Sequence, residues 1–163
     1  MNILVLGDII GENSIKKIKE ILPNAIKENN IDFVIANGEN SADGMGITSK
    51  IFKDLMCSGV NVVTMGNHTW GKKDIFNIIE NKNLLRPANY PKDVLGNGYG
   101  IYECNNKKIA VINLIGRVDM NVLSENPFIV VEDIIKKIKN DVNIIIVDFH
   151  AEATAEKIAM GYF

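Results

Sequence analysis

The stretch VNVVTMGNHTWGKK, residues 60–73, places an apolar run directly before a glycine, an asparagine and a histidine. Short apolar runs rich in β-branched residues are typical of strands inside a covered sheet. The first six residues of the stretch are therefore predicted to form a buried strand that ends at Gly66. A turn needs the glycine, but it does not need the polar side chains of Asn67 and His68, which indicate a functional site at the end of this strand.

Four further runs have the same strand character, and helical patterns lie between them. The strand-like runs cover residues 3–6, 33–36, 109–114 and 144–149. Apolar residues at helical spacing predict helices from Ile15 onward and over residues 48–57, 73–81 and 131–139. Pro23 is expected to end or kink the first of these helices. Thr48 is expected to cap the second.

The order of these elements predicts the fold class. Residues 99–116 are predicted to form a hairpin with Asn105 and Asn106 at its turn. The segment before it is predicted to be a loop, in which Arg86, Asn89 and Tyr90 are expected either to border a substrate or to lie on the surface. The resulting order, βαβαβα, a hairpin and then αβα, predicts one α/β domain over residues 1–163, with a layered sheet flanked by helices.

Composition excludes several classes of protein. The 163 residues are 47% hydrophobic and 23% charged, with a net charge of -2, which is ordinary for a globular domain. This balance gives no argument for nucleic-acid or membrane-surface binding. We expect no membrane span and no signal peptide, and hence a cytoplasmic protein. Cys57 and Cys104 have no CxxC spacing and are predicted to be reduced thiols.

Polar side chains follow the predicted strands at the point where each strand ends. They are Asp8, the pair Glu39 and Asn40, the pair Asn67 and His68, and the pair Asp148 and His150. Each has an ordinary structural explanation, such as a helix cap for Asp8 or a satisfied core histidine for His150. Because the carboxyl ends of strands meet along one edge of a sheet, the whole set favours a functional site there.

This set of side chains suits a two-metal hydrolytic site. Carboxylates, amide oxygens and a neutral imidazole bind borderline divalent metals such as Mn, Fe, Zn or Co. One carboxylate can bridge two ions about 3.5–4 Å apart, which activate a water and hold both reacting oxygens. Gly7, Gly38 and Gly66, just before the candidate ligands, are expected to give sharp turns and room for a substrate.

The ordered series GD, GEN, GNH and a final histidine resembles the calcineurin-like metallophosphoesterases. General members carry D-x-H in the first block and G-D in the second, whereas this chain has GDII and GEN. Those departures match the YmdB-like phosphodiesterases, which the chain resembles throughout its length. The blocks that carry this resemblance are VIANGENSADGMGIT, TMGNHTWGKKDI, LLRPANYP and VDFHAEATAEKIAMGYF.

The resemblance implies a role for each candidate residue. Asp8, Glu39 and Asn40 would be ligands or near-ligands of a first metal ion, with Glu39 bridging to a second ion held by Asn67 and His150. His68 would face the phosphate instead, where it would protonate the leaving oxygen or stabilise charge. The implied activity is hydrolysis of phosphodiesters, notably 2′,3′-cyclic nucleotides, with two divalent ions of iron or manganese and zinc as an alternative.

One departure from the family bears on activity. The family continues to a further strand and a G-x-H-x-H block with two more histidine ligands, which this chain lacks. We therefore expect a metallophosphoesterase-type fold that is incomplete at its C-terminus and forms the N-terminal part of a longer protein, or is completed by a C-terminal fragment as a partner. Glu152 and Glu156, the nearest replacements for the missing ligands, are predicted to lie on the last helix. The alternatives are a phosphomonoesterase or nuclease, and a catalytically inert binding module; a homo-oligomer is also compatible with the sequence.

Overall fold

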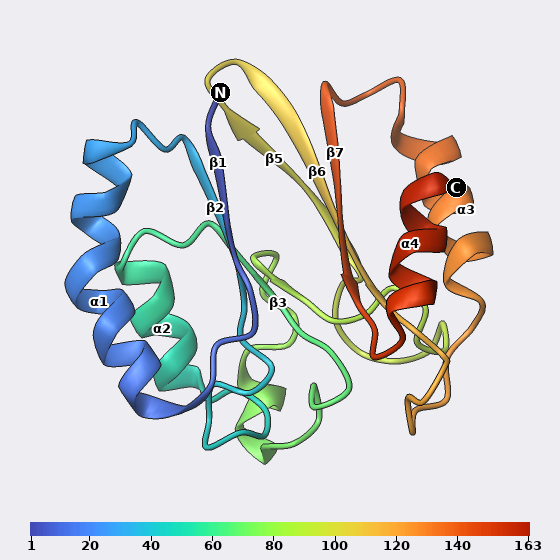
Figure 1. Ribbon diagram of the computed structural model, residues 1–163, viewed down its shortest axis with the longest axis horizontal. Coiled ribbons are helices and arrows are strands. Elements are labelled where there is room, and N and C mark those ends of the chain that lie inside the picture. The colour runs from blue at the N-terminus through green and yellow to red at the C-terminus, as the bar shows by residue number, and fades with distance from the viewer.

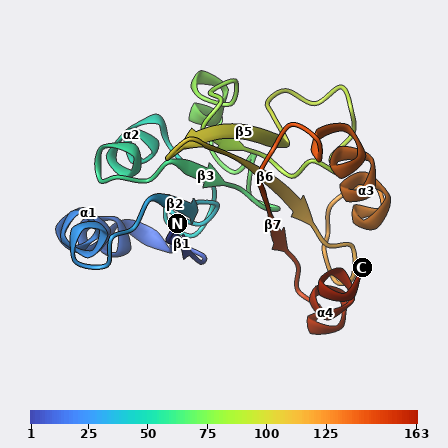
Figure 2. The same cartoon turned by 90° about the horizontal axis from the view of Figure 1, so that it is seen from above.

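Two sheets stacked between two pairs of helices make up the molecule. The computed structural model describes residues 1–163. One sheet has the strand order β1-β2-β3-β4 and the other β5-β6-β7. Helices α1 and α2 cover the outer face of the first sheet, and α3 and α4 lie on the other side of the molecule beside the second (Figure 1). Figure 2 shows the same layers from above, with the strands between the helix pairs.

The first sheet is parallel and follows the predicted βαβ pattern. Its elements are β1 (Ile3–Leu6), α1 (Gly11–Glu28), β2 (Phe33–Asn37), α2 (Ser49–Cys57), β3 (Val62–Thr64), a 3₁₀ helix η1 (Lys73–Asn77) and β4 (Leu84–Leu85). Thr48 caps α2 as predicted, because its side chain accepts a hydrogen bond from the backbone N–H of Ile51.

The second sheet begins with the predicted hairpin. β5 (Tyr99–Cys104) and β6 (Lys107–Ile115) are antiparallel, and β7 (Ile144–His150) pairs with β6 in parallel. Asn105 and Asn106 form the turn with φ of 49° and 59°, a conformation that asparagine tolerates. Helix α3 (Pro127–Ile138) precedes β7 and α4 (Thr154–Tyr162) follows it.

Three details of the predicted helices are wrong. Of the two effects expected of Pro23, an end to the helix is wrong, because α1 continues through it to Glu28, with Ile15 and Leu22 buried in the core. The helix expected over residues 73–81 is only the short η1, where the Asp74 side chain is used by Ser49 N–H and Asn77. Helix α3 begins four residues earlier than predicted, because Asn126 caps it and Pro127 suits its first position.

Alternation along the strands divides the interior into three apolar layers. On β2, Val34 and Ala36 pack towards α1 and α2, whereas Phe33 and Ile35 pack towards the second sheet. On β6, the residues of one parity, including Val111, face the first sheet, and those of the other parity pack with α3. Side chains of the inward parity on β2, β6 and β7 therefore meet between the two sheets.

None of the helices is both long and apolar enough to cross a membrane.

Candidate functional site

The polar side chains that follow the strands come together, but from two sheets rather than one. Asp8 follows β1, Glu39 and Asn40 follow β2, and the Asn67–His68 pair follows β3, all in the first sheet. His150 ends β7 in the second sheet. The expectation of a single sheet edge is wrong, because β7 pairs only with β6. His150 reaches the group because it shares the inward parity of Ile144 and Ile146.

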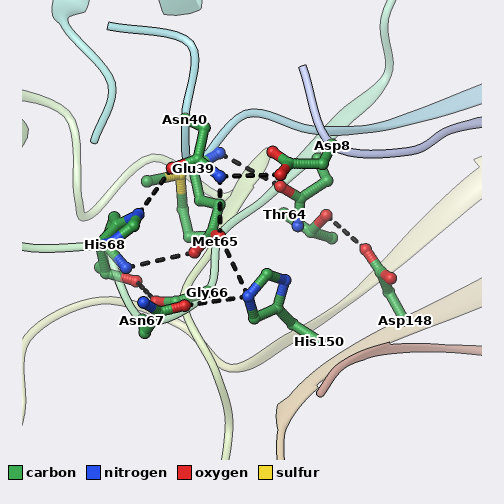
Figure 3. A network of polar contacts seen from close by, with 12 residues as sticks. Asp8, Glu39, Asn40, Thr64, Met65, Gly66, Asn67, His68, Asp148 and His150 are labelled. Atoms are coloured by element: carbon green, nitrogen blue, oxygen red, sulfur yellow. Dashed lines mark hydrogen bonds and ion pairs between the residues drawn. The ribbon is translucent and has the colours of Figure 1, made fainter. Parts of the chain in front are cut away.

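Glu39 lies at the centre of the group. It is only 1% exposed, and its Oε1 lies 3.0 Å from Nε2 of His150. Its other oxygen accepts a hydrogen bond of 3.2 Å from the backbone N–H of His68. The same Nε2 of His150 lies 2.9 Å from Oδ1 of Asn67. One nitrogen and two oxygens, from residues of two sheets, therefore converge (Figure 3).

Asn40 links this centre to Asp8 and to His68. Its Nδ2 donates to Asp8 Oδ2 at 2.8 Å and to Glu39 Oε1 at 3.2 Å. Because both carboxylates only accept, the amide nitrogen must face them, and the amide oxygen faces His68 at 2.6 Å from Nδ1. Nδ1 of His68 therefore donates to Asn40, and Nε2 is left as the ring position open to a substrate.

Electrostatics favour an ion pair at the centre. Burial alone would raise the pKa of Glu39, but the His150 side chain and the His68 backbone N–H outweigh burial and hold this pKa below its ordinary value of 4.5. Burial would lower the pKa of His150, but its bond to Glu39 and the charges of Asp8 and Asp148 raise it above 6.5. In the absence of metal, Glu39 and His150 are therefore both predominantly charged between pH 4.5 and pH 6.5.

Asp148 lies two residues before His150 on β7 and shares its inward face. Its side chain accepts a hydrogen bond from the hydroxyl of Thr64 on β3. Asp148 makes no hydrogen bond to the imidazole of His150, and it ties the two sheets together beside the group instead.

The three glycines before the candidate ligands are not equivalent. A β-carbon at Gly66 would overlap Glu39 Oε2 and would lie 2.7 Å from Cδ2 of His150. One at Gly38 would come within 2.9 Å of Val63 Cγ1, whereas one at Gly7 would meet nothing within 4 Å. Close approach therefore requires glycine at Gly66, but no steric contact requires it at Gly7.

The donor atoms fit one divalent ion by their chemistry and spacing. No group of three or more His, Cys, Asp and Glu side chains lies close enough to hold a metal, so Glu39 and His150 need a ligand of another kind, and the amide oxygen of Asn67 lies beside His150. Octahedral ligand atoms about 2.1 Å from an ion lie about 3.0 Å apart. Nε2 of His150 is 3.0 Å from the Glu39 oxygen and 2.9 Å from the Asn67 oxygen, which is compatible with this spacing.

Asp8 and Asn40 are placed differently from the other candidate ligands. Asp8 lies near Glu39, but the amide N–H groups of Asn40 stand between the two carboxylates. A cation would satisfy the same pair of carboxylates. The oxygen of Asn40 is bonded to His68, so it is not directed at this position.

Two cavities flank the group. One, of about 380 Å³, is lined by Asp8, His150 and neighbouring residues of β1 and β7. The other, of about 360 Å³, is lined by Asn67, His68 and the loop of residues 119–122. Glu152 lines both. The expectation that Glu152 lies on the last helix is wrong, because α4 begins only at Thr154.

Glu156 does lie on α4, but its carboxylate is already used. It accepts hydrogen bonds from the backbone N–H groups of Arg117 and Val118 at 3.0–3.3 Å. Helix α4 thereby holds the loop that continues into the second cavity. Glu156 is therefore a poor replacement for a missing metal ligand.

Three polar residues expected in a surface or substrate loop are buried in the interior. Arg86, Asn89 and Tyr90 are 7%, 0% and 3% exposed. The guanidinium of Arg86 donates to three backbone carbonyls of its own loop. The Tyr90 hydroxyl donates to the carbonyl of Gly66 at 2.9 Å, and burial raises the pKa of Tyr90 to about 12.

Asn113 is a further buried polar residue that sequence reasoning missed. It lies on β6 with the inward parity, is 0% exposed, and donates to the carbonyls of Met65 and Leu85 at 2.7 and 2.8 Å. An asparagine in the middle of the apolar run 109–115 was the signal that could have identified it.

Comparisons with known proteins show the family of the chain. A family model described as YmdB-like protein matches residues 4–163. The 2′,3′-cyclic-nucleotide 2′-phosphodiesterase of Bacillus subtilis (strain 168) is 43% identical over 164 residues, which cover 100% of this chain and 62% of the relative.

Two solved structures are similar over nearly the whole chain. A hypothetical protein from Thermus thermophilus is 31% identical with a TM-score of 0.92, covering 99% of this chain and 62% of that one. A novel phosphatase from Mycoplasma pneumoniae is 38% identical with a TM-score of 0.90, covering 98% and 58%. The chain thus spans about three fifths of the length of the proteins it matches.

Proposed function

We propose that this chain, which belongs to the YmdB-like protein family, provides the reactive centre of a metal-dependent phosphodiesterase acting on 2′,3′-cyclic nucleotides. The observation that carries the proposal is the meeting of His150 Nε2 with the oxygens of Glu39 and Asn67 at 3.0 and 2.9 Å. The name of the Bacillus subtilis relative, together with its 43% identity, supports the substrate class.

The proposed ligands of one metal ion are Glu39, Asn67 and His150. Asp8 does not form a group of three with Glu39 and His150, so it would serve a second ion, in place of the Asn40 amide that lies between the two carboxylates. Glu39 and Asn67 offer oxygens and His150 a ring nitrogen, a mixture that suits Fe or Mn, with Zn as an alternative. Two such ions, once bound, would activate a water and polarise the phosphoryl oxygens. Asn40 would become a ligand only by turning its oxygen away from His68 Nδ1, and in its observed orientation it holds His68 instead.

His68 is the proposed proton donor. Its Nδ1 is held by Asn40 at 2.6 Å, which fixes the orientation of the ring and leaves Nε2 free at the edge of the cavity that also borders Asn67. This role requires a ring with a proton on each nitrogen. When water attacks the phosphorus and the bond to one ribose oxygen breaks, the proton on Nε2 passes to that departing oxygen, and the proton released by the attacking water restores the ring.

The test uses the protein at the length that its gene encodes, called the full-length protein below, with the 163-residue chain alongside it. We expect hydrolysis of bis-p-nitrophenyl phosphate and 2′,3′-cyclic AMP with Mn or Fe, and none in chelator. The solved Mycoplasma structure is named a phosphatase, so p-nitrophenyl phosphate serves as the monoester comparison. If the monoester is hydrolysed faster than the two diesters, the protein is a phosphomonoesterase and not a phosphodiesterase. If none of these substrates is hydrolysed, a binding module is favoured.

Two variants separate the roles of the adjacent residues Asn67 and His68. We expect Asn67→Ala to weaken metal retention, because it removes an oxygen 2.9 Å from His150 Nε2. His68→Ala should retain metal and lose turnover by about 10²–10⁴-fold, the usual range for general acid catalysis. Two measurements test these roles: the metal content after gel filtration and the turnover at saturating Mn. If both variants keep their metal and their rate, the assignment of roles is overturned.

A further inference from the structure

We propose that Tyr90 is a positioning residue that holds Asn67 and His68 at their distance from His150. The inference rests on the proposed function for its kinetic consequence, but its structural basis is independent of any metal. Tyr90 touches none of the reacting groups. It acts through the carbonyl of Gly66, the residue immediately before Asn67.

The Gly66 carbonyl is held from three directions. The Tyr90 hydroxyl donates to it at 2.9 Å, and the Thr69 hydroxyl donates at 2.6 Å. The backbone N–H of Thr69 also donates to it, at 3.2 Å. Both bonds from Thr69 lie within the same turn, so they shape the turn without fixing its place in the molecule. Only the bond from Tyr90 joins this carbonyl to a distant segment.

The segment that carries Tyr90 is anchored on the second sheet. The backbone N–H of Ala88 donates to the carbonyl of Asn113 on β6 at 2.7 Å. The amide of Asn89 exchanges two bonds with the backbone of Ile115, accepting at 2.9 Å and donating at 2.7 Å. Three consecutive residues therefore connect the end of β6 to the turn after β3.

This connection ends beside His150. In the register of β6 and β7, Ile115 pairs with His150. A continuous path thus runs from His150 through the end of β6 and Asn89 to Tyr90, and from there to Gly66. Asn67, the residue after Gly66, lies with its Oδ1 2.9 Å from His150 Nε2, so the path begins and ends at the candidate site. Burial raises the pKa of Tyr90 to about 12, so the hydroxyl keeps its proton for this bond throughout the neutral range.

The decisive variant is Tyr90→Phe, and the chain provides a matched control. Tyr102, on β5 and away from the site, also has a hydroxyl that donates to a backbone carbonyl, that of Lys82 at 2.6 Å. In the full-length protein, Tyr90→Phe should lower kcat about 10- to 100-fold and leave KM within about twofold, since misplaced groups slow the chemical step. Tyr102→Phe should leave both unchanged.

A second readout does not depend on activity. The chain has only two histidines, so the imidazole ¹⁵N signals of the metal-free 163-residue chain report directly on His68 and His150. Tyr90→Phe should shift the signals of His68 and weaken its Nδ1–H bond to Asn40, whereas Tyr102→Phe should not. Asn89→Ala, which removes the two bonds that anchor the Tyr90 segment to Ile115, is the alternative variant if Tyr90→Phe does not fold, and a shift of the His68 signals is expected there too.

The outcomes are separable from those of the proposed function. A wild-type protein without turnover overturns the phosphodiesterase proposal, and the imidazole signals still decide the role of Tyr90. If Tyr90→Phe matches Tyr102→Phe in the imidazole spectrum, or lowers kcat without moving the imidazole signals, the positioning role is overturned.

Discussion

Gly66→Ala tests whether close packing around Glu39 and His150 builds the site. The added β-carbon would overlap Glu39 Oε2 and lie 2.7 Å from both Glu39 Cδ and His150 Cδ2, well inside the contact distance of about 3.5 Å. Because Glu39 is 1% exposed, it has little space to move into. The backbone at Gly66 has no positive φ, so the whole effect is one of packing.

The magnitude follows from two opposing effects. Overpacking in a closed interior costs about 1–3 kcal/mol. Replacing glycine by alanine also stabilises the folded protein by about 0.4–1 kcal/mol, because it lowers the conformational entropy of the unfolded chain. We expect the free energy of unfolding to fall by about 1.3 kcal/mol, and by no more than about 2.6 kcal/mol. With a urea slope of about 2 kcal/mol per molar, the unfolding midpoint should fall by about 0.65 M, and by no more than about 1.3 M.

Gly7→Ala is the matched control in the same assay. A β-carbon at Gly7 meets nothing within 4 Å, and Gly7 also lacks a positive φ, so this variant should keep or slightly raise the midpoint. Urea unfolding followed by circular dichroism measures both variants in chelator, and Mn titration then measures metal uptake. If the Gly66 and Gly7 variants unfold at the same urea concentration and take up Mn equally, close packing at Gly66 does not organise the site.

Two further predictions concern the interior between the sheets. Asn113→Leu should lower the free energy of unfolding by about 1–3 kcal/mol, because it leaves the carbonyl of Met65 without its side-chain donor, whereas the carbonyl of Leu85 keeps its bond from the Met65 N–H; urea unfolding measures it, and a loss below about 0.5 kcal/mol would contradict it. In chelator, the stabilisation from Glu39 and His150 should be greatest between pH 4.5 and 6.5. The lowered pKa of Glu39 means that its contribution is lost as the pH falls through the folded pKa, and the raised pKa of His150 means that its contribution is lost as the pH rises through the folded pKa. Unfolding midpoints across about pH 4–9 should lose this dependence in Glu39→Gln.

The strands and their polar ends could be predicted because the signals are local. β1 begins and ends as predicted, at Ile3 and Leu6, and Glu39, His68 and His150 all lie where strand ends place them. The division into two sheets could not be predicted. Nothing in the apolar run of β7 says whether it pairs with β3 or with β6, since both choices bury the same residues. The two-residue strand β4 is too short to leave any periodic pattern.

The burial of the loop before the hairpin had no local signal either. The segment is rich in proline and glycine, a composition typical of surface loops. The partners of Asn89 are backbone groups 26 and 36 positions away, and that of Tyr90 is 24 positions away. Such contacts exist only after the two sheets have packed, so no window of sequence contains both ends of them.

The layer between the sheets changes character along its length, and this change accounts for the position of the site. At one end it is apolar, with Phe33 and Ile35 of β2 packed with Ile109 and Val111 of β6. Apolar contacts hold two sheets together but fix their relative position only loosely, because the hydrophobic effect has no direction.

Towards the carboxyl ends of the strands, directional bonds replace these contacts. Thr64 donates to Asp148, Asn113 to Met65 and Leu85, and Tyr90 to Gly66. Hydrogen bonds require defined distances and angles, so this end of the layer fixes the two sheets relative to each other. That requirement is strictest where the proposed ligand atoms are divided between sheets, since Asn67 and His150 could share an ion only if the sheets keep one relative position.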